Sequence, residues 1–365
     1  RTVPEDSTGV AHILEHTALC GSEKYPVRDP FFMMIRRSLN TFMNAFTSSD
    51  WTAYPFASQN RKDFDNLLKV YLDSVFFARL DPLDFAQEGH RLEFSNAEDC
   101  NTPLTFKGVV FNEMKGAMSS INSTLWQTTC KFLYPTNTYH HNSGGDPTRI
   151  PDLTYDQFKE FYKVHYHPSN SIFITYGNIP AAEHQEKFDA LALSRFERLD
   201  CHIAVKDEER YKAPKQFVEG YASNPSEPSD KKTHIIIAWL LGDSTNLEET
   251  MQARLLSSVL LDHSGSPLMQ ALETSEFGTS PSPLCGLEDS QKQLCFVCGI
   301  EGSEEFFADS VEQAILDVLK NVAENGLEEE QIAASLHQLE LQQREISAGR
   351  LPFGLNLALT ALTSA

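Results

Sequence analysis

Residues 7–22 read STGVAHILEHTALCGS and form the most specific pattern in this chain. Ser7 is a possible helix cap, and Val10, Ile13 and Leu14 follow it with helical spacing. The segment therefore predicts a short helix from residue 7 to residue 20, which the glycine and the proline that follow would end. Its apolar content indicates a helix that is at least half buried.

The same segment contains His12 and His16, four residues apart, with Glu15 between them. On a helix this spacing places two imidazoles on one face, about 5–6 Å apart and within reach of one ion. The order His-x-x-Glu-His inverts the commoner His-Glu-x-x-His. In either order a carboxylate beside the metal can take a proton from a bound water, whose pKa zinc lowers to about 7. The pattern predicts His12 and His16 as zinc (Zn²⁺) ligands and Glu15 as the general base.

A chance arrangement of two surface histidines and a glutamate is the alternative. The apolar helix argues against it, because imidazoles on a half-buried helix need partners. The small, uncharged Thr17 and Ala18 that follow the motif support the same interpretation.

A catalytic zinc usually has three protein ligands, so a third donor must come from elsewhere in the chain. Glu113 lies in a predicted helix over residues 109–131, among apolar neighbours, and we expect it to point at a buried partner because a lone buried glutamate is costly. Glu88 and Glu93, on another apolar-flanked stretch that we expect to be helical, are competing candidates, although Glu93 resembles a solvated helix end. The local sequence around each residue favours Glu113 as the third ligand and does not exclude Glu88 or Glu93.

The rest of the chain mixes predicted helices and strands. Residues 135–151 read as a long loop rich in proline, glycine and asparagine. The CFVC run at residues 295–298 has metal-binding spacing, but it lies in an alternating apolar segment and is predicted to be a strand. Helices are expected at 30–39, 62–77, 155–164, 248–261, 304–322 and 327–346, and strands within 41–57 and at 171–176 (buried), 234–241 and 293–300.

A polar, proline-rich stretch between residues 200 and 232 is the best candidate for a connection between domains. We therefore expect a zinc-binding catalytic domain at residues 1–205, a linker at 206–232 and a second domain at 233–365. With 365 residues, of which 41% are apolar, the chain can build two sizeable cores.

Fifty-one acidic and 30 basic residues give a net charge of −21, which disfavours nucleic acid or an anionic membrane as a partner. The negative charge would attract a cationic partner, or it only keeps the protein soluble.

The chain contains no run of about 18 uncharged apolar residues, so the sequence predicts no membrane span. The chain starts at Arg1 with no leader to indicate a compartment, and its seven scattered cysteines fit reduced thiols inside a cell.

The sequence resembles the pitrilysin and insulysin metallopeptidases, and within them the presequence protease branch. Besides residues 7–22, five segments carry the resemblance and together they span nearly all of the predicted first domain. They are NAFT (44–47), QEG (87–89), GVVFNEMKG (108–116), SGGDP (143–147) and HYHPSN (165–170).

The resemblance implies a mixed α/β fold with two related domains, each a β-sheet with helices packed on it. It implies that His12, His16 and Glu113 bind zinc while Glu15 activates the water, although in pitrilysin-like relatives the third ligand falls where Glu93 stands here. It also implies that Asn44, Ala45, Phe46 and Thr47 form an exposed strand edge that aligns a peptide substrate by main-chain hydrogen bonds. From the residues alone, a core strand is an equal alternative for residues 44–47.

The implied function is that of an endopeptidase that degrades short, unstructured peptides such as basic targeting presequences. A non-catalytic scaffold or a processing-peptidase-like subunit is the alternative, against which the intact Glu15 argues. The implied location is the mitochondrial matrix or a plastid in a eukaryote, and the cytoplasm in a bacterium. Members of this branch are much longer, so we expect a fragment whose missing C-terminal half closes the chamber and supports full activity.

Overall fold

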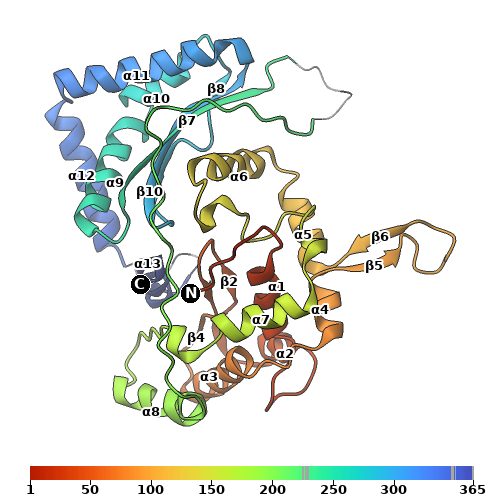
Figure 1. Cartoon of the computed structure of the whole chain (residues 1–365). Helices are drawn as coiled ribbons and strands as arrows, with labels where there is room; N and C mark the ends of the chain where they lie inside the picture. The colour runs from red at the N-terminus through yellow and green to blue at the C-terminus, as the bar shows by residue number, and fades with distance from the viewer. Residues whose placement is uncertain (224–225, 227–229, 347–348, 350, 364–365) are drawn as a thin grey trace.

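The computed structural model describes residues 1–223, 226, 230–346, 349 and 351–363. Its helices and strands gather in two groups, one formed by residues 1–195 and one by residues 233–346, joined by a long extended segment (Figure 1). The final helix, α13 (Phe353–Thr363), lies beside the first group (Figure 1). The mixed α/β class expected from the sequence is confirmed.

Helix α1 (Val10–Ala18) forms the centre of the first group. Ala11, Ile13 and Leu14 are fully buried, because helical spacing collects them on one face. This face packs against Val110 and Phe158 in the largest apolar cluster of the first group. The surrounding helices are α2 (Pro30–Arg37), α3 (Arg61–Phe76), α4 (Pro82–Glu88), α5 (Val109–Ala117), α6 (Ile121–Leu133), α7 (Tyr155–His165) and α8 (Ala181–Leu191).

The strands of the first group form three separate antiparallel pairs instead of one continuous sheet. Strand β1 (Asn40–Met43) pairs with β4 (Phe56–Ser58), and β2 (Phe46–Thr47) pairs with β3 (Thr52–Ala53). These four short strands occupy the segment that the sequence predicted to be extended. The third pair, β5 (Arg91–Phe94) and β6 (Leu104–Lys107), projects away from the rest of the molecule (Figure 1).

The predicted elements at residues 109–131 and 171–176 were wrong. Residues 109–131 form α5 and α6 instead of one helix; Gly116 and the serines after it propagate a helix poorly, and the Ser119 hydroxyl donates to the Gly116 carbonyl where α5 ends. Residues 171–176 are extended but pair with no described strand, and Ile172 and Tyr176 are more than half exposed. An apolar run there cannot form a buried strand without a neighbour to complete its ladder.

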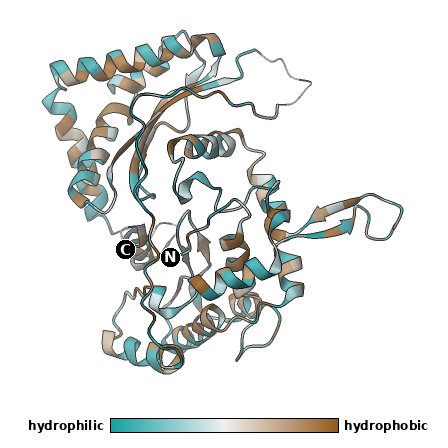
Figure 2. Ribbon diagram, in the orientation of Figure 1, coloured by the Kyte–Doolittle hydropathy of each residue, from teal (hydrophilic) through white to brown (hydrophobic). Residues whose placement is uncertain are grey.

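The second group is a sheet covered by helices. Strands β7 (Thr233–Asp243) and β10 (Gln293–Ser303) pair over most of their length, and hydrophobic residues line both strands (Figure 2). Cys295 and Cys298 are buried in β10, as the predicted strand requires. The other elements are β8 (Ser280–Pro281), β9 (Gly286–Glu288), α9 (Leu247–Leu261), α10 (Pro267–Glu273), α11 (Ala308–Asn325) and α12 (Glu329–Arg344).

Direct hydrogen bonds connect the two groups near the start of β10. The Tyr134 hydroxyl donates to the Gln293 carbonyl, and the Tyr139 hydroxyl accepts the Lys292 N–H. Glu208, in the expected linker, accepts from the Thr136 hydroxyl while its own N–H donates to the Gln293 side chain. Across the described residues, no helix combines the length and the apolar character that a membrane crossing requires.

Candidate metal centre

Helix α1 presents His12 and His16 on the face opposite its buried apolar residues. Their rings meet edge to face with centroids 5.0 Å apart. From α5, the Glu113 Oε2 atom lies 3.8 Å from His12 Nε2 and 3.9 Å from His16 Nε2. One ligand atom from each of the three residues lies within 4.8 Å of the other two. The structure thus brings together the three residues that the sequence predicted as zinc ligands.

Both imidazoles are held through their other ring nitrogen. His12 Nδ1 lies 3.0 Å from the carbonyl oxygen of Gly144, and His16 Nδ1 lies 3.1 Å from Glu88 Oε2. Because a carbonyl and a carboxylate can only accept, both Nδ1 atoms carry the proton and donate it. Both Nε2 atoms face Glu113, and in the neutral imidazoles that a metal binds they would carry the lone pairs, an arrangement that supports metal-binding histidines in proteins.

Gly144 reaches α1 from the loop before α7, and this approach needs small residues. A Cβ atom at neighbouring Gly145, whose φ is +106°, would lie 2.8 Å from two side-chain atoms of Ile150 and 3.0 Å from the Cα of Gly9. A side chain there is excluded by both backbone conformation and space. The glycine pair thus permits the loop to lie against α1.

Glu88 is a buried carboxylate at the end of α4, with 8% of its surface exposed. Burial raises its pKa, but hydrogen bonds from His16 and from the Gln87 amide outweigh that effect and leave the pKa below its usual value. For His16, burial lowers the pKa, whereas the bond to Glu88 and the charge of Glu15 raise it, with a net increase. The two groups therefore stabilise each other's charged forms.

Glu15 is not one of the three residues whose ligand atoms converge. Its Oε2 atom accepts a hydrogen bond of 2.5 Å from the Thr47 hydroxyl on β2. Helix α1 contacts both β2 and β3, which brings this strand pair beside the motif. The sequence motif alone contains no signal for the Thr47 contact, because the two residues meet only through folding.

The donor set fits zinc. Two imidazole nitrogens and one carboxylate oxygen are a common ligand set of catalytic zinc sites, which leave a fourth position open. Tetrahedral bonds of about 2.0–2.1 Å place ligand atoms about 3.3 Å apart. Glu113 is 55% exposed, so its side chain is free to make the small movement that would close the remaining gap.

The structure corrects the expected surroundings of the acidic candidates. The Glu113 side chain is more than half exposed, and the buried residues of α5 are Val110 and Phe111. Glu88 contacts the Nδ1 side of His16 and lies behind the ligand set. Glu93 is on strand β5 and not on a helix, and its carboxylate pairs with the Arg91 and Lys107 side chains.

The four predicted substrate-binding residues lie in different surroundings: Asn44 is exposed, Ala45 is buried, and Phe46 and Thr47 form a short strand. The Asn44 N–H donates to the Pro55 carbonyl, and Ala45 is buried. Phe46 and Thr47 are half buried and form β2, which pairs with β3 alone among the described strands. One edge of β2 is thus left without a partner strand in the described part of the chain.

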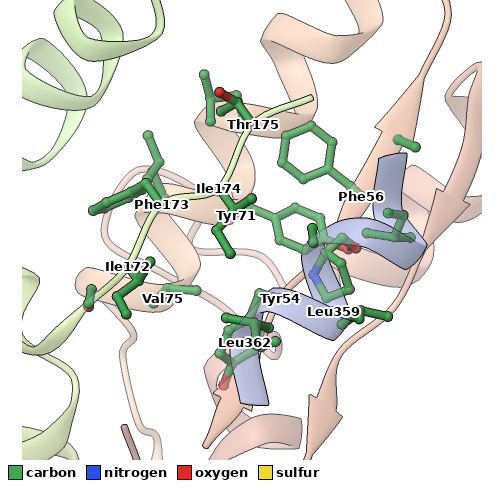
Figure 3. Close-up of a pocket in the computed structure, with 18 of the residues that line it drawn as sticks. Tyr54, Phe56, Tyr71, Val75, Ile172, Phe173, Ile174, Thr175, Leu359 and Leu362 are labelled. Carbon is green, nitrogen blue, oxygen red and sulfur yellow. The ribbon is translucent and has the colours of Figure 1, made fainter. Parts of the chain in front are cut away.

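An apolar cavity of about 520 Å³ lies elsewhere in the first group. Leu359 and Leu362 of α13 approach it beside Tyr54 and Val75, and residues 172–175 border it (Figure 3). His12, Glu15, His16 and Glu113 are not among the described residues that line it.

Two family profiles match this chain. The profile described as insulinase (peptidase family M16) covers residues 1–121, and the profile described as peptidase M16 inactive domain covers residues 152–339. The Xenopus tropicalis protein named mitochondrial presequence protease is 48% identical over 363 residues, which are 98% of this chain and 35% of that protein. The mouse protein of the same name is 46% identical over 358 residues, or 98% and 34% of the two chains. The chain thus spans about a third of the length of these relatives.

Solved structures share the fold at low sequence identity. A protease from Helicobacter pylori superposes with a TM-score of 0.70 at 16% identity, over 98% of this chain and 82% of that one. A peptidase M16 inactive domain from Pseudomonas fluorescens superposes with a TM-score of 0.64 at 13% identity, over 99% and 79% of the two chains.

Proposed function

Because the chain belongs to the insulinase family of peptidases, family M16, we propose that it holds the zinc centre of an endopeptidase that cleaves short, unstructured peptides. The observation that carries the proposal is the convergence of His12, His16 and Glu113, with the Nδ1 protons of both histidines already engaged. Glu15 lies on the same helix as His12 and His16.

Zinc held by the triad would polarise the scissile carbonyl and make a water molecule acidic enough to act as nucleophile near neutral pH. The Glu15 carboxylate accepts the proton of the attacking water and then delivers a proton to the leaving amine. Glu88 and the Gly144 carbonyl keep the two imidazoles in one tautomer and orientation throughout.

The open edge of β2 supports a role for Asn44, Ala45, Phe46 and Thr47 in substrate binding. An extended peptide that adds to this edge would pair its main chain with Phe46 and Thr47 and bring a peptide bond close to α1. Such recognition depends on the backbone of the substrate, so it suits unfolded peptides of varied sequence.

Basic targeting presequences are the substrate class that we propose. The net charge of −21 attracts basic peptides over long range, and presequences are rich in arginine and poor in acidic residues. The relatives are named presequence proteases and are mitochondrial. We accordingly propose the mitochondrial matrix as its location.

The description of the second profile as an inactive domain favours a second candidate, in which the chain is a non-catalytic scaffold or a processing-peptidase-like subunit. That profile lies outside the histidine motif, and a purely structural metal site would need no base at Glu15.

Metal analysis and peptide cleavage separate the two candidates. A catalytic centre should contain about one zinc per chain and should cleave a fluorogenic basic peptide in a manner that a chelator abolishes and added zinc restores. Bound zinc without any chelator-sensitive cleavage, in the protein at its full natural length, would support the scaffold instead.

A further inference from the structure

The β2–β3 hairpin, residues 46–53, links the Glu15 carboxylate to the second group of elements. We propose that Thr47 is a positioning residue for Glu15, and that the hydrogen bonds from Lys292 to Tyr139 and from Tyr139 to Asp50 hold the hairpin in place. The inference rests on the proposed function, because it assumes that Glu15 is the base. It adds a connection between the base and the second part of the chain.

Thr47 fixes one end of this connection. Its hydroxyl lies 2.5 Å from Glu15 Oε2, and the carboxylate can only accept, so the threonine donates. Threonine in a strand has few side-chain rotamers, and Thr47 pairs with Thr52 across the hairpin. A hydroxyl directed by a fixed backbone therefore selects one orientation of a glutamate side chain that would otherwise sample several.

Asp50 fixes the turn of the hairpin. The Ser48 N–H donates to the Trp51 carbonyl, which closes the turn, and the Asp50 carbonyl accepts the Thr2 N–H. Asp50 is 4% exposed, and its carboxylate accepts hydrogen bonds from the Arg1 guanidinium and, at 3.3 Å, from the Tyr139 hydroxyl. A buried carboxylate with these donors holds its position strongly, since its displacement would leave a charge without partners.

Tyr139 joins the turn to the second group. It is 2% exposed, and its hydroxyl donates to Asp50 while accepting the Lys292 N–H at 2.8 Å. Burial raises the pKa of Tyr139, so the phenol remains a neutral donor. Lys292 immediately precedes β10, the long central strand of the second group.

The arrangement predicts that a shift of β10 against the first group alters the orientation of Glu15. Movement of Lys292 would release the Tyr139 hydroxyl, then the Asp50 carboxylate, and with it the strand that carries Thr47. The second group would thereby influence catalysis although the described structure places none of its residues beside the zinc ligands.

The first test changes Thr47 in the zinc-loaded protein at its full natural length. Thr47→Val keeps the shape and removes the hydroxyl, so we expect kcat to fall about tenfold or more, with KM within about twofold and zinc content unchanged. Thr47→Ser restores the donor and should recover most of kcat. The matched control is Thr105→Val on β6, which removes a hydroxyl from an exposed strand and should leave kcat unchanged.

A second readout needs no turnover. Crystal structures of the 365-residue chain should show one orientation of Glu15 in the parent and several in Thr47→Val. A single parent-like orientation in Thr47→Val, together with an unchanged kcat, would overturn the inference.

The second test is a double-mutant cycle for the more distant contact. Tyr139→Phe removes the hydroxyl, and Asp50→Asn is the alternative should the first variant fold poorly. Each should lower kcat by several-fold, and neither should lower it much further in the Thr47→Val background, because all act through one carboxylate. Independent, multiplicative losses would show that Tyr139 does not act through the hairpin.

Glu15→Gln distinguishes failure of the inference from failure of the proposed function. Unchanged turnover in Glu15→Gln, or a parent without zinc-dependent turnover, contradicts the proposed function, and the Glu15 orientation in the Thr47 variants still decides the inference. An inactive Glu15→Gln beside a fully active Thr47→Val contradicts the inference alone.

Discussion

The two histidines of α1 use both of their ring nitrogens, one toward the protein and one toward the proposed metal. His16 Nδ1 donates to a buried carboxylate and His12 Nδ1 to a backbone carbonyl. This difference means that one orienting partner, Glu88, can be changed by mutation without altering the backbone. At the scale of single residues, the site therefore separates ligands, base and orienting groups cleanly enough for each role to be tested alone.

Glu15→Gln should retain zinc and lose turnover, whereas His16→Ala should lose the zinc itself. The amide is nearly isosteric with the carboxylate and cannot accept the proton, while removal of an imidazole deletes one of three ligands. Metal content and the cleavage rate of a fluorogenic peptide are the measurements. Retention of a tenth or more of parental turnover by the Gln variant would exclude Glu15 as the base.

Glu88→Gln should weaken zinc binding by about 10–100-fold while one zinc still binds at saturation. The amide is a weaker acceptor for the His16 Nδ1 proton and removes a buried negative charge beside the site. Competition with a chromogenic chelator measures the affinity. Glu93→Gln is the matched control, since Glu93 pairs with Arg91 and Lys107 on β5–β6; an equal loss in both variants would contradict the orienting role of Glu88.

At the scale of elements, the site depends on how α1 is packed. Its buried face contacts Phe158 of α7, and the loop that precedes α7 supplies Gly144 to His12. Helix α7 begins with a capping box, in which the Thr154 hydroxyl accepts the Gln157 N–H and the Gln157 side chain accepts the Thr154 N–H. The start of α7 thus helps to fix the loop that orients a ligand.

Thr154→Ala should lower the free energy of unfolding by about 1 kcal/mol, because it leaves an N–H at the helix start without its acceptor. Denaturant unfolding of the zinc-free chain, followed by circular dichroism, measures the change. Thr154→Ser keeps the acceptor and should behave like the parent. Equal destabilisation by Ser and Ala would show that the methyl group, and not the cap, is responsible.

At the scale of the whole molecule, the excess of 21 negative charges should make cleavage depend on salt. Attraction between an acidic protein and a basic peptide raises the association rate and is screened over about 10 Å at 0.1 M ionic strength. We expect kcat/KM for a basic peptide to fall severalfold between about 0.05 M and 0.5 M salt. The kcat/KM for a neutral peptide of equal length should change little. An equal salt dependence for the two peptides would show that the negative charge does not attract the substrate and only keeps the protein soluble.

The sequence by itself determined the helices and strands whose apolar residues recur with a regular spacing. Four-residue spacing placed His12 and His16 on one face of α1, and the apolar spacing of Ile13 and Leu14 fixed which face is buried. The same kind of signal predicted helices α2, α3, α7, α9, α11 and α12 and strands β7 and β10 to within a few residues. These elements follow from interactions between residues that are near in the chain.

Only the tertiary structure decided the contacts between residues that are distant in the chain. It brought Glu113 to the histidines, placed Glu88 behind His16 and brought Thr47 to Glu15. It also left residues 171–176 without a partner among the described strands, although their composition predicted a buried strand. Such outcomes depend on which surfaces meet when helices and strands pack. Short stretches of a single sequence do not indicate which surfaces will meet.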